Sequence, residues 1–295
     1  RDCLLSRGLG DVYKRQGVDH RMSPLLRFPR QLQRYDSAAV CCDRLAERLE
    51  AHVRQWLSMP LAKRRPLGLA TGRTMEPLYA ALVQRLRLWS AQDLDELRRR
   101  WSSFNLDEYL GLPAGDPCRY STYMRRHLGE PLLLRPETLH LPNGSAADAD
   151  GAAQSYAAEL NACGGVGVQL LGLGNNGHVG FNEPPTTADQ ACHVVDLSDA
   201  TRRQNSGLFG GDPAAVPAQA ITLGLHEILA ADEIHLVVTG AVKADILKQL
   251  LTLPAPQPGL PASWLLNHPC VWLWADADAM DRSLALDIAE DRNEH

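Results

Sequence analysis

The segment Leu170-Leu-Gly-Leu-Gly-Asn-Asn-Gly-His-Val-Gly-Phe-Asn-Glu-Pro184 carries the clearest structural signal in this sequence. It begins as an apolar run and then becomes rich in glycine and in polar side chains, among them Asn176, His178 and Glu183. The pattern predicts a buried strand that runs into a glycine-rich loop. In open α/β sheets, loops at the carboxyl ends of strands are where ligands bind. The simpler alternative is a strand followed by a long polar turn, with His178 as an ordinary loop histidine.

Apolar runs and amphipathic stretches alternate along the rest of the chain. The apolar runs predict further buried strands, at residues 67–70, 101–106, 233–239 and 270–275. The amphipathic stretches predict helices, at residues 36–57, 75–88, 91–100, 120–128, 147–163, 220–229, 262–266 and 277–290. Strands that alternate with helices predict an α/β fold, a doubly wound and mostly parallel sheet with helices on both faces.

The chain has 295 residues, enough for one large α/β domain or two small ones. We expect a single domain over residues 22–295, because no internal repeat or low-complexity linker divides it. The polar stretch at about 185–217 has little apolar periodicity and is typical of a lid or binding loop. Residues 1–21 do not fit the pattern of the remaining chain, so we expect them to be a non-native or disordered extension; the alternative is a native flexible tail.

Composition and charge narrow the range of partners. The formal net charge is −5, so the chain has no basic surplus and we expect neither nucleic acid nor a membrane as a partner. No apolar run approaches the roughly 20 residues of a membrane span. The seven cysteines are odd in number and scattered, without a C-x-x-C pair. They indicate a reduced cytoplasmic protein and not a disulfide scaffold or a zinc site.

Three other strand ends carry polar or charged side chains. Residues 71–74 (Thr-Gly-Arg-Thr) lie between a predicted strand and a predicted helix, which is a ready site for an anion. Asp107 and Glu108 follow the strand at 101–106 and suit acid–base chemistry if one of them is desolvated. Lys243 opens a helix against the macrodipole preference, which a bound anion would explain. A structural turn, solvated carboxylates and a surface lysine are the simpler alternatives at these three places.

Several segments, in the same order, resemble the glucosamine-6-phosphate deaminase/isomerase family. The most specific are Phe104-Asn-Leu-Asp-Glu-Tyr109 and Asn176-Gly-His-Val-Gly-Phe-Asn-Glu-Pro184, and the resemblance covers residues 36–290. It implies a Rossmann-like sheet and conversion of an amino-sugar 6-phosphate and water to a ketose 6-phosphate and ammonia. For glucosamine 6-phosphate the product is fructose 6-phosphate. The resemblance implies no metal or organic cofactor, and homo-oligomers are common in the family.

The resemblance also implies catalytic roles. His178 opens the sugar ring, and Asp107 carries a proton between C2 and C1. Glu183 orients and tunes His178, and Glu108 supports the substrate-binding site. Asn176 is also among the expected catalytic residues, although many members carry an aspartate at its position. Because of this difference, we expect Glu183 alone to tune His178.

The residues expected to hold the 6-phosphate are Thr71, Gly72, Arg73, Thr74 and Lys243. Arg73 is bulkier than the usual residue of this loop. The family's lid motif, whose arginine clamps the phosphate, reads Gln-Asn-Ser-Gly at residues 204–207 and lacks that arginine. Our hypothesis is that Arg73, Arg202 or Arg203 replaces it.

Three alternative functions stay open. Residues 191–193 and 222–225 are similar to galactosamine-6-phosphate isomerases, so the C4 epimer is an alternative substrate. A 6-phosphogluconolactonase, on the same fold, would have arginine in place of Tyr109 and D-G-H-x-x-S-L-F in place of residues 176–183. A non-catalytic sugar-phosphate-binding protein is the third alternative, which the bulky Arg73 and the missing lid arginine favour.

Overall fold

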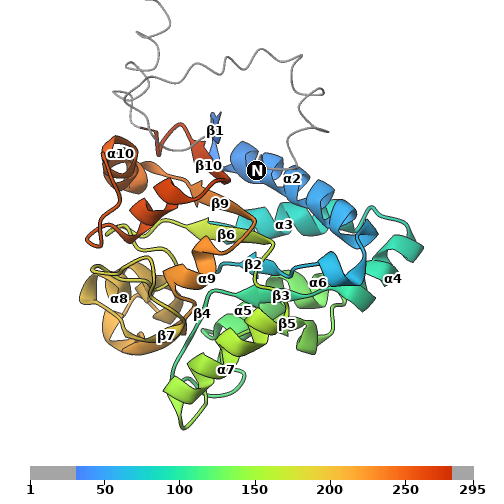
Figure 1. The fold of residues 1–295 in the computed structure, drawn as a ribbon, viewed down its shortest axis with the longest axis horizontal. Helices are drawn as coiled ribbons and strands as arrows, with labels where there is room; N and C mark the ends of the chain where they lie inside the picture. The colour runs from blue at the N-terminus through green and yellow to red at the C-terminus, as the bar shows by residue number, and fades with distance from the viewer. Residues whose placement is uncertain (1–30, 281–295) are drawn as a thin grey trace, which may run out of the picture.

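The structure is a computed structural model, and it describes residues 31–280 (Figure 1). The expected extension at residues 1–21 lies outside the described residues, as does most of the helix predicted at 277–290. The strands of the main sheet are β1 Gln31–Tyr35, β2 Leu67–Leu69, β3 Ser103–Asn105, β5 Leu139–His140, β6 Val168–Gly172, β9 Glu233–Val238 and β10 Val271–Asp276. They pair in parallel in the order β1-β10-β9-β6-β2-β3-β5. The predicted doubly wound, mostly parallel α/β sheet is confirmed.

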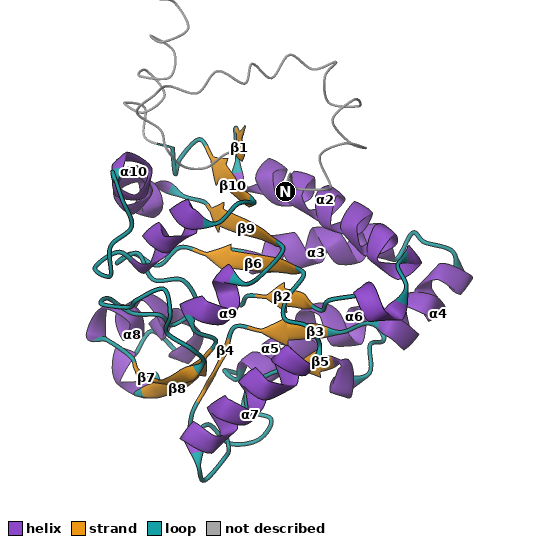
Figure 2. Cartoon of the chain, in the orientation of Figure 1, coloured by secondary structure: helices purple, strands orange, loops and turns teal. Residues whose placement is uncertain are grey.

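A small antiparallel sheet adjoins the main one. Its strands are β4 Asp107–Tyr109, β8 Gln219–Thr222 and β7 His193–Asp196, in the order β4-β8-β7 (Figure 2). A single residue, Leu106, separates β3 from β4; its N–H donates to the carbonyl of Leu69 in β2 at 3.0 Å, and its carbonyl accepts from the N–H of Leu223 at 2.7 Å. Leu106 therefore ties the two sheets together beside the end of β2.

Helices connect the strands and cover the sheet. The α-helices are α2 Ala38–Ser58, α3 Met75–Leu86, α4 Ala91–Arg100, α5 Tyr120–Met124, α6 Glu130–Leu132, α7 Ala149–Ala162, α8 Asp199–Asn205, α9 Leu225–Leu229 and α10 Ala244–Thr252. The 3₁₀ and π turns are η2 Leu61–Lys63, η3 Arg125–Gly129, η4 Pro136–Thr138, η5 Ser206–Phe209, η6 Pro213–Ala215, η7 Ala241–Lys243 and η8 Pro261–Asn267. None of the helices between residues 31 and 280 is long and apolar enough to cross a membrane.

Local signals in the sequence explain several helix ends. The Ser37 side chain accepts a hydrogen bond from the N–H of Val40 and caps α2. After the last residues of α7, Gly164 and Gly165 take positive φ values of 83° and 80°. Such left-handed residues end a helix by satisfying its last carbonyls, and glycine adopts them without steric cost.

The small sheet is where our predictions fail. The helix predicted at 220–229 is wrong in its first half, because residues 219–222 form strand β8 between β4 and β7. Thr222 pairs with Asp107 on one side and with His193 on the other, so sheet pairing overrides the apolar pattern. The polar stretch at 185–217 is also more regular than a loop, since it contains β7 and α8.

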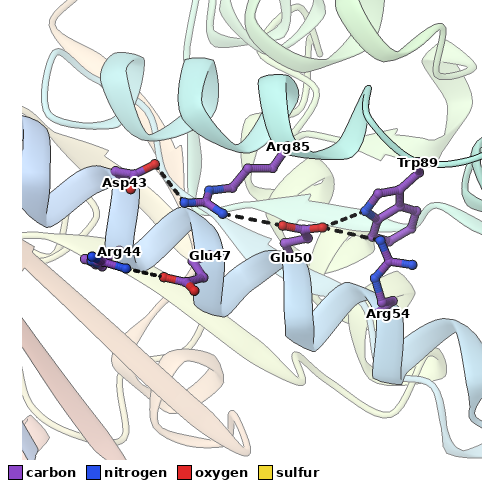
Figure 3. Close-up of polar contacts among 7 residues, drawn as sticks. All are labelled: Asp43, Arg44, Glu47, Glu50, Arg54, Arg85 and Trp89. Atoms are coloured by element: carbon purple, nitrogen blue, oxygen red, sulfur yellow. Dashed lines mark hydrogen bonds and ion pairs between the residues drawn. The ribbon is translucent and has the colours of Figure 1, made fainter. Parts of the chain in front are cut away.

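Polar contacts join charged side chains of α2 to Arg85 of α3 and to Trp89, which follows α3 (Figure 3). We call this group the α2–α3 ion network; its residues are Asp43, Arg44, Glu47, Glu50, Arg54, Arg85 and Trp89. Arg85 contacts Asp43 at 2.9 Å and Glu50 at 3.7 Å. The Trp89 indole N–H donates to Glu50 at 2.7 Å, and the Arg54 guanidinium lies 4.0 Å from the centre of the Trp89 ring. Each charge in the network thus has a partner of opposite sign.

Candidate active site

A cavity of about 200 Å³ opens at the carboxyl ends of β2, β6 and β9. From β2 the chain builds outward to β3 and β5, and it then returns to β6 on the other side of β2. Such a reversal of strand order leaves a crevice in which open α/β sheets bind ligands. Seven of the ten predicted site residues line this cavity: Thr71, Gly72, Arg73, Thr74, Asp107, His178 and Lys243. The other three, Glu108, Asn176 and Glu183, lie behind its wall.

The loop after β6 folds back tightly and presents His178 to the cavity. The N–H of Gly174 donates to the carbonyl of His178 at 2.9 Å, which closes the turn. A Cβ on Gly174 would lie 2.4 Å from the imidazole ring, so only glycine lets the ring lie against the backbone here. Gly177 takes a positive φ of 83° within the turn. These two positions explain why the predicted loop needs closely spaced glycines.

A chain of hydrogen bonds runs from His178 through Asn176 to Glu183. A carboxylate only accepts, so the amide NH₂ of Asn176 donates to Glu183 Oε2 at 2.7 Å. The amide oxygen then faces His178 Nδ1 at 2.7 Å and, because it too only accepts, Nδ1 carries the proton. This leaves the lone pair of His178 Nε2 free. The expectation that Glu183 alone tunes His178 is therefore wrong, because Asn176 lies between the two residues.

Burial sets the charge of His178. The side chain is 7% exposed, and this desolvation lowers its pKa to about 4, while Glu183 favours the charged form and Lys243 opposes it. At neutral pH the imidazole is therefore uncharged, and its Nε2 is a proton acceptor. The uncharged amide of Asn176 fixes this tautomer without adding the negative charge that an aspartate would bring.

Glu183 also connects the loop to the stretch expected to act as a lid. Its Oε1 accepts from the hydroxyl of Ser198 at 3.1 Å. Ser198 is the N-cap of α8, where its hydroxyl accepts from the N–H of Thr201 at 3.2 Å. Glu183 therefore positions both Asn176 and the start of α8.

Asp107 and Glu108 are neighbours in β4 but have different surroundings. Asp107 lines the cavity, and burial, with a smaller contribution from Glu108, raises its pKa to about 8. Glu108 is fully buried; its oxygens accept from the N–H groups of Tyr109 (3.0 Å), Tyr120 (2.9 Å) and Ser121 (2.9 Å). We expected Glu108 among the substrate-binding residues, but the structure assigns it to holding α5 against β4.

Two cationic side chains share one end of the cavity. Arg73 and Lys243 both line it, and Asp107 is the only acidic side chain among the described residues that do so. Burial and then the charge of Arg73 lower the pKa of Lys243 to about 8. The Lys243 ammonium group donates to the Asn175 amide oxygen at 2.5 Å, a neutral acceptor that does not cancel its charge. Together with the hydroxyl and backbone groups of residues 71–74, these cations form a site suited to an anion.

Residues 204–207 lack the lid arginine of the family, but other side chains of this segment line the cavity. Gln204 and Asn205 line it, and Gln204 accepts from the Asn175 N–H at 3.0 Å. Arg202 does not line the cavity; it donates to the carbonyls of Val216 and Ala214, each at 3.2 Å. Arg203 does not line it either, which leaves Arg73 as the candidate replacement.

Sequence reasoning missed five polar residues of the cavity: Asn175, Gln204, Asn205, Tyr120 and Thr239. Asn175 adjoins the predicted Asn176, and its polar side chain in the glycine-rich loop was a usable signal. Gln204 belongs to the lid motif at residues 204–207, in which our prediction considered only the absent arginine. Tyr120 lies at the start of a short helix, and its spacing gave no sign that it faces a cavity.

Known proteins resemble this chain in sequence and in structure. Residues 36–274 match the family described as glucosamine-6-phosphate isomerases/6-phosphogluconolactonase. The glucosamine-6-phosphate deaminase of Halalkalibacterium halodurans is 39% identical over 216 residues, which cover 73% of this chain and 85% of that protein. The protein of the same name from Rhodopirellula baltica is 42% identical over 214 residues, covering 72% and 82% of the two chains.

Two solved structures show the relationship of the fold. A structure described as a monomeric glucosamine-6-phosphate deaminase superimposes with a TM-score of 0.76 at 31% identity, covering 86% of this chain and 99% of that one. The 6-phosphogluconolactonase from Leishmania guyanensis gives a TM-score of 0.64 at 20% identity, over 85% and 98% of the two chains. The second similarity shows a shared fold alone.

Proposed function

This chain belongs to the glucosamine-6-phosphate isomerase/6-phosphogluconolactonase family, and from that premise we propose that it is a glucosamine-6-phosphate deaminase. The reaction converts glucosamine 6-phosphate and water to fructose 6-phosphate and ammonia, a step of amino-sugar metabolism. One observation carries the proposal: Asp107 and the uncharged His178 face a cavity that also holds the cations of Arg73 and Lys243. A base, a proton carrier and an anion site are what this reaction requires.

His178 performs ring opening in this proposal. Its free Nε2 accepts the proton of the sugar's O1 hydroxyl and delivers a proton to the ring oxygen, which breaks the bond between C1 and the ring oxygen. The hydrogen bond from Nδ1 to Asn176 keeps Nε2 unprotonated before the reaction. An imidazole that starts uncharged suits this exchange, because it must first accept a proton.

Asp107 carries out the isomerisation. Its carboxylate takes the proton from C2 of the open-chain sugar and returns it to C1, while the ammonium group of the substrate gives a proton to O1. The double bond then lies between C2 and the nitrogen. Water adds to the resulting imine carbon, and ammonia leaves. The pKa of about 8 places Asp107 near the ideal value for a base, and the ammonium group of the substrate favours its ionisation.

The 6-phosphate lies against residues 71–74, Arg73 and Lys243 in this proposal. Arg73 replaces the missing lid arginine, since Arg202 is bound to backbone carbonyls and Arg203 lies outside the cavity lining. Arginine presents several N–H donors in a planar fork that matches phosphate oxygens. Its charge adds to that of Lys243.

Residues 185–217 act as a lid in this proposal. Three contacts support it by joining the stretch to the cavity wall. Ser198 donates to Glu183, Gln204 accepts from Asn175, and the Asn205 amide donates to the Tyr109 hydroxyl at 3.0 Å. Homo-oligomer formation and a cytoplasmic location stay predictions, and light scattering of the purified protein tests the first.

Sequence relationships favour the deaminase over the lactonase. The relatives from Halalkalibacterium halodurans and Rhodopirellula baltica, at 39% and 42% identity, carry the deaminase name, whereas the lactonase neighbour is 20% identical. Tyr109 and Phe181 also stand where the lactonase pattern would have arginine and serine. These two side chains pack together beside the cavity, with ring centres 5.5 Å apart.

Ammonia release from glucosamine 6-phosphate and from galactosamine 6-phosphate tests the proposal. We expect release from the glucosamine epimer with wild-type protein and almost none with Asp107→Asn. Faster release from the galactosamine epimer would support the galactosamine-6-phosphate branch instead. No release from either sugar would contradict the enzyme proposal, and hydrolysis of 6-phosphogluconolactone and binding of sugar phosphates would then test the two remaining alternatives.

A further inference from the structure

Two tyrosine hydroxyls hold the backbone of the loop that follows β2. The hydroxyl of Tyr79, in α3, donates to the carbonyl of Ala70 at 2.6 Å. The hydroxyl of Tyr123, in α5, donates to the carbonyl of Gly72 at 2.9 Å. Two helices far apart in sequence therefore fix two alternate carbonyls of a single short loop.

These bonds determine the direction of two backbone N–H groups. In a trans peptide the C=O and the following N–H point in opposite directions. The carbonyls of Ala70 and Gly72 point at tyrosines that do not line the cavity, whereas residues 70–74 of the loop all line it. The N–H groups of Thr71 and Arg73 are accordingly turned away from the tyrosines, toward the cavity side of the loop.

We propose that Tyr79 and Tyr123 are positioning residues for phosphate binding, because they turn two carbonyls out of the cavity and two N–H donors into it. A carbonyl oxygen that faced the cavity would repel an anion, and an N–H in the same place attracts it. The inference rests on the proposed function in taking the anion to be the 6-phosphate of the substrate. According to this inference, Tyr79 and Tyr123 influence the affinity for phosphate although neither side chain contacts the phosphate.

The two tyrosines are suited to a fixed role. Tyr79 is fully buried and Tyr123 is 7% exposed, and burial raises the pKa of each hydroxyl far above its usual value. Both hydroxyls therefore remain donors over the whole working pH range. The Tyr79 and Tyr123 rings meet edge to face with centres 6.4 Å apart, and the His127 ring lies 4.2 Å from that of Tyr123 on its π turn. This packing holds the hydroxyls in place before any ligand binds.

The backbone of the loop also needs external support. Gly72 takes a positive φ of 103°. Glycine adopts many backbone conformations with little steric cost, so the residue itself does not hold its carbonyl in one direction. Its carbonyl accepts one further bond, from the Met75 N–H at 2.9 Å, at the start of α3. Loss of the Tyr123 hydroxyl leaves that bond alone to define the orientation of the peptide between Gly72 and Arg73.

The test compares three tyrosine-to-phenylalanine variants of the full chain. Tyr79→Phe and Tyr123→Phe each remove one hydroxyl that holds the loop. Tyr156→Phe is the matched control, because the Tyr156 hydroxyl also donates to backbone carbonyls, those of Asn105 at 2.7 Å and His140 at 3.1 Å, and the residue does not line the cavity. The measurements are the Kd of inorganic phosphate by titration calorimetry, KM and kcat for glucosamine 6-phosphate, and Tm.

We expect each loop variant to weaken phosphate binding about fivefold, and the double variant about 25-fold, with a parallel rise in KM. At saturating substrate, kcat should stay within about twofold of wild type, because the lost hydroxyls bond to the carbonyls of Ala70 and Gly72 and not to Asp107 or His178. Tyr156→Phe should lower Tm to a similar extent and leave the Kd of phosphate unchanged. A merely structural role would instead move Tm in all three variants and Kd in none.

Three results would overturn the inference. They are a wild-type Kd in both loop variants, an equal loss of affinity in Tyr156→Phe, and wild-type protein that binds no phosphate. Failure of the proposed function gives a different pattern. In that case wild-type protein releases no ammonia, while phosphate binding and its dependence on Tyr79 and Tyr123 remain.

Discussion

Charged side chains are arranged in opposite ways on α2–α3 and in the cavity. In the α2–α3 ion network, Arg85 has Asp43 at 2.9 Å and Glu50 at 3.7 Å (Figure 3). In the cavity, Arg73 and Lys243 face a common space, and the charge of Arg73 disfavours the charged form of Lys243. In the ion network, each charged side chain already has a partner of opposite charge. In the cavity, the structure describes no ion pair between either cation and an acidic side chain of residues 31–280.

The difference separates charges that stabilise the fold from charges that bind. Exposed ion pairs contribute modestly to stability, typically about 0–1 kcal/mol each. Like charges held together cost stability, and proteins keep them where function depends on them. Substitutions in the two regions should therefore change different quantities.

The largest expected effect is that of Asp107→Asn on turnover. Removing a general base lowers kcat by about 10²- to 10⁴-fold, and we expect a loss in this range in the ammonia assay. The matched control in the ion network, Asp43→Asn, should leave kcat unchanged. A variant Asp107→Asn with more than a tenth of wild-type kcat would contradict the catalytic role.

The same variant should be more stable than wild type at alkaline pH. The folded-state pKa of Asp107 is raised from 3.8 to about 8, so its contribution to stability is fully present below pH 3.8 and is lost as the pH rises through 8. Asparagine does not titrate, so the Tm difference in favour of Asp107→Asn should grow from pH 4 to pH 8. A difference that stays constant over this range would show that the carboxyl is not destabilised by burial.

The second effect in size is that of Arg73→Ala on substrate affinity. Hydrogen bonds to charged groups contribute about 1.5–3 kcal/mol, so KM should rise about 10- to 100-fold. The free energy of unfolding should not fall, because the substitution removes repulsion of Lys243. Arg202→Ala is the control; it should lower stability and leave KM unchanged, since Arg202 binds the carbonyls of Val216 and Ala214. The opposite pattern in the two variants would identify Arg202 as the clamp.

The third effect is that of Asn176→Leu on His178. The variant keeps the volume of the side chain but removes the acceptor at Nδ1 and the donor to Glu183. We expect kcat to fall about tenfold, the cost of a buried group left without its partner. Nitrogen NMR of labelled histidine should show Nδ1–H in wild type and a mixture of tautomers in the variant. If both the spectrum and kcat are unchanged, the hydrogen bonds from His178 through Asn176 to Glu183 have no catalytic role.

The smallest effect is that of Arg85→Ala. Its pairs with Asp43 and Glu50 are partly exposed, so the free energy of unfolding should fall by about 1 kcal/mol or less. High salt should reduce the difference, because it screens exposed pairs. KM and kcat should match wild type. A change in either would mean that the ion network acts on the cavity.

The sequence predicts the parts of the fold that are buried or strongly periodic. The apolar runs of β2, β6, β9 and β10 and the amphipathic helices α2, α3 and α7 lie where their patterns indicate. The strands β1, β5 and β7 escape prediction because they lie at sheet edges, where one side is not covered and polar residues interrupt the pattern. Strand β8 is misread as helix because its apolar residues are separated from those of α9 only by a short segment with a single glycine, Gly224.

For the site, the sequence predicts which loops line the cavity better than it predicts the hydrogen bonds between their side chains. Asp107, His178 and Lys243 reach one cavity because they follow strands whose carboxyl ends meet. The place of Asn176 between His178 and Glu183 depends on the turn closed by Gly174, which no pattern of residue types specifies. The tyrosine bonds to the loop after β2 depend on how α3 and α5 pack, which is a property of the assembled fold.

The alternation of side chains along β4 makes this short strand sensitive to changes of length. Asp107 faces the cavity and Glu108 faces the N–H groups of α5, because successive residues of a strand point to opposite sides. Deleting one residue at Leu106, or inserting one there, would exchange the two carboxylates. The cavity would then receive the carboxylate with the longer side chain, and α5 would lose its support. We therefore expect insertions and deletions to be tolerated in the surface turns around this strand and selected against within residues 106–109.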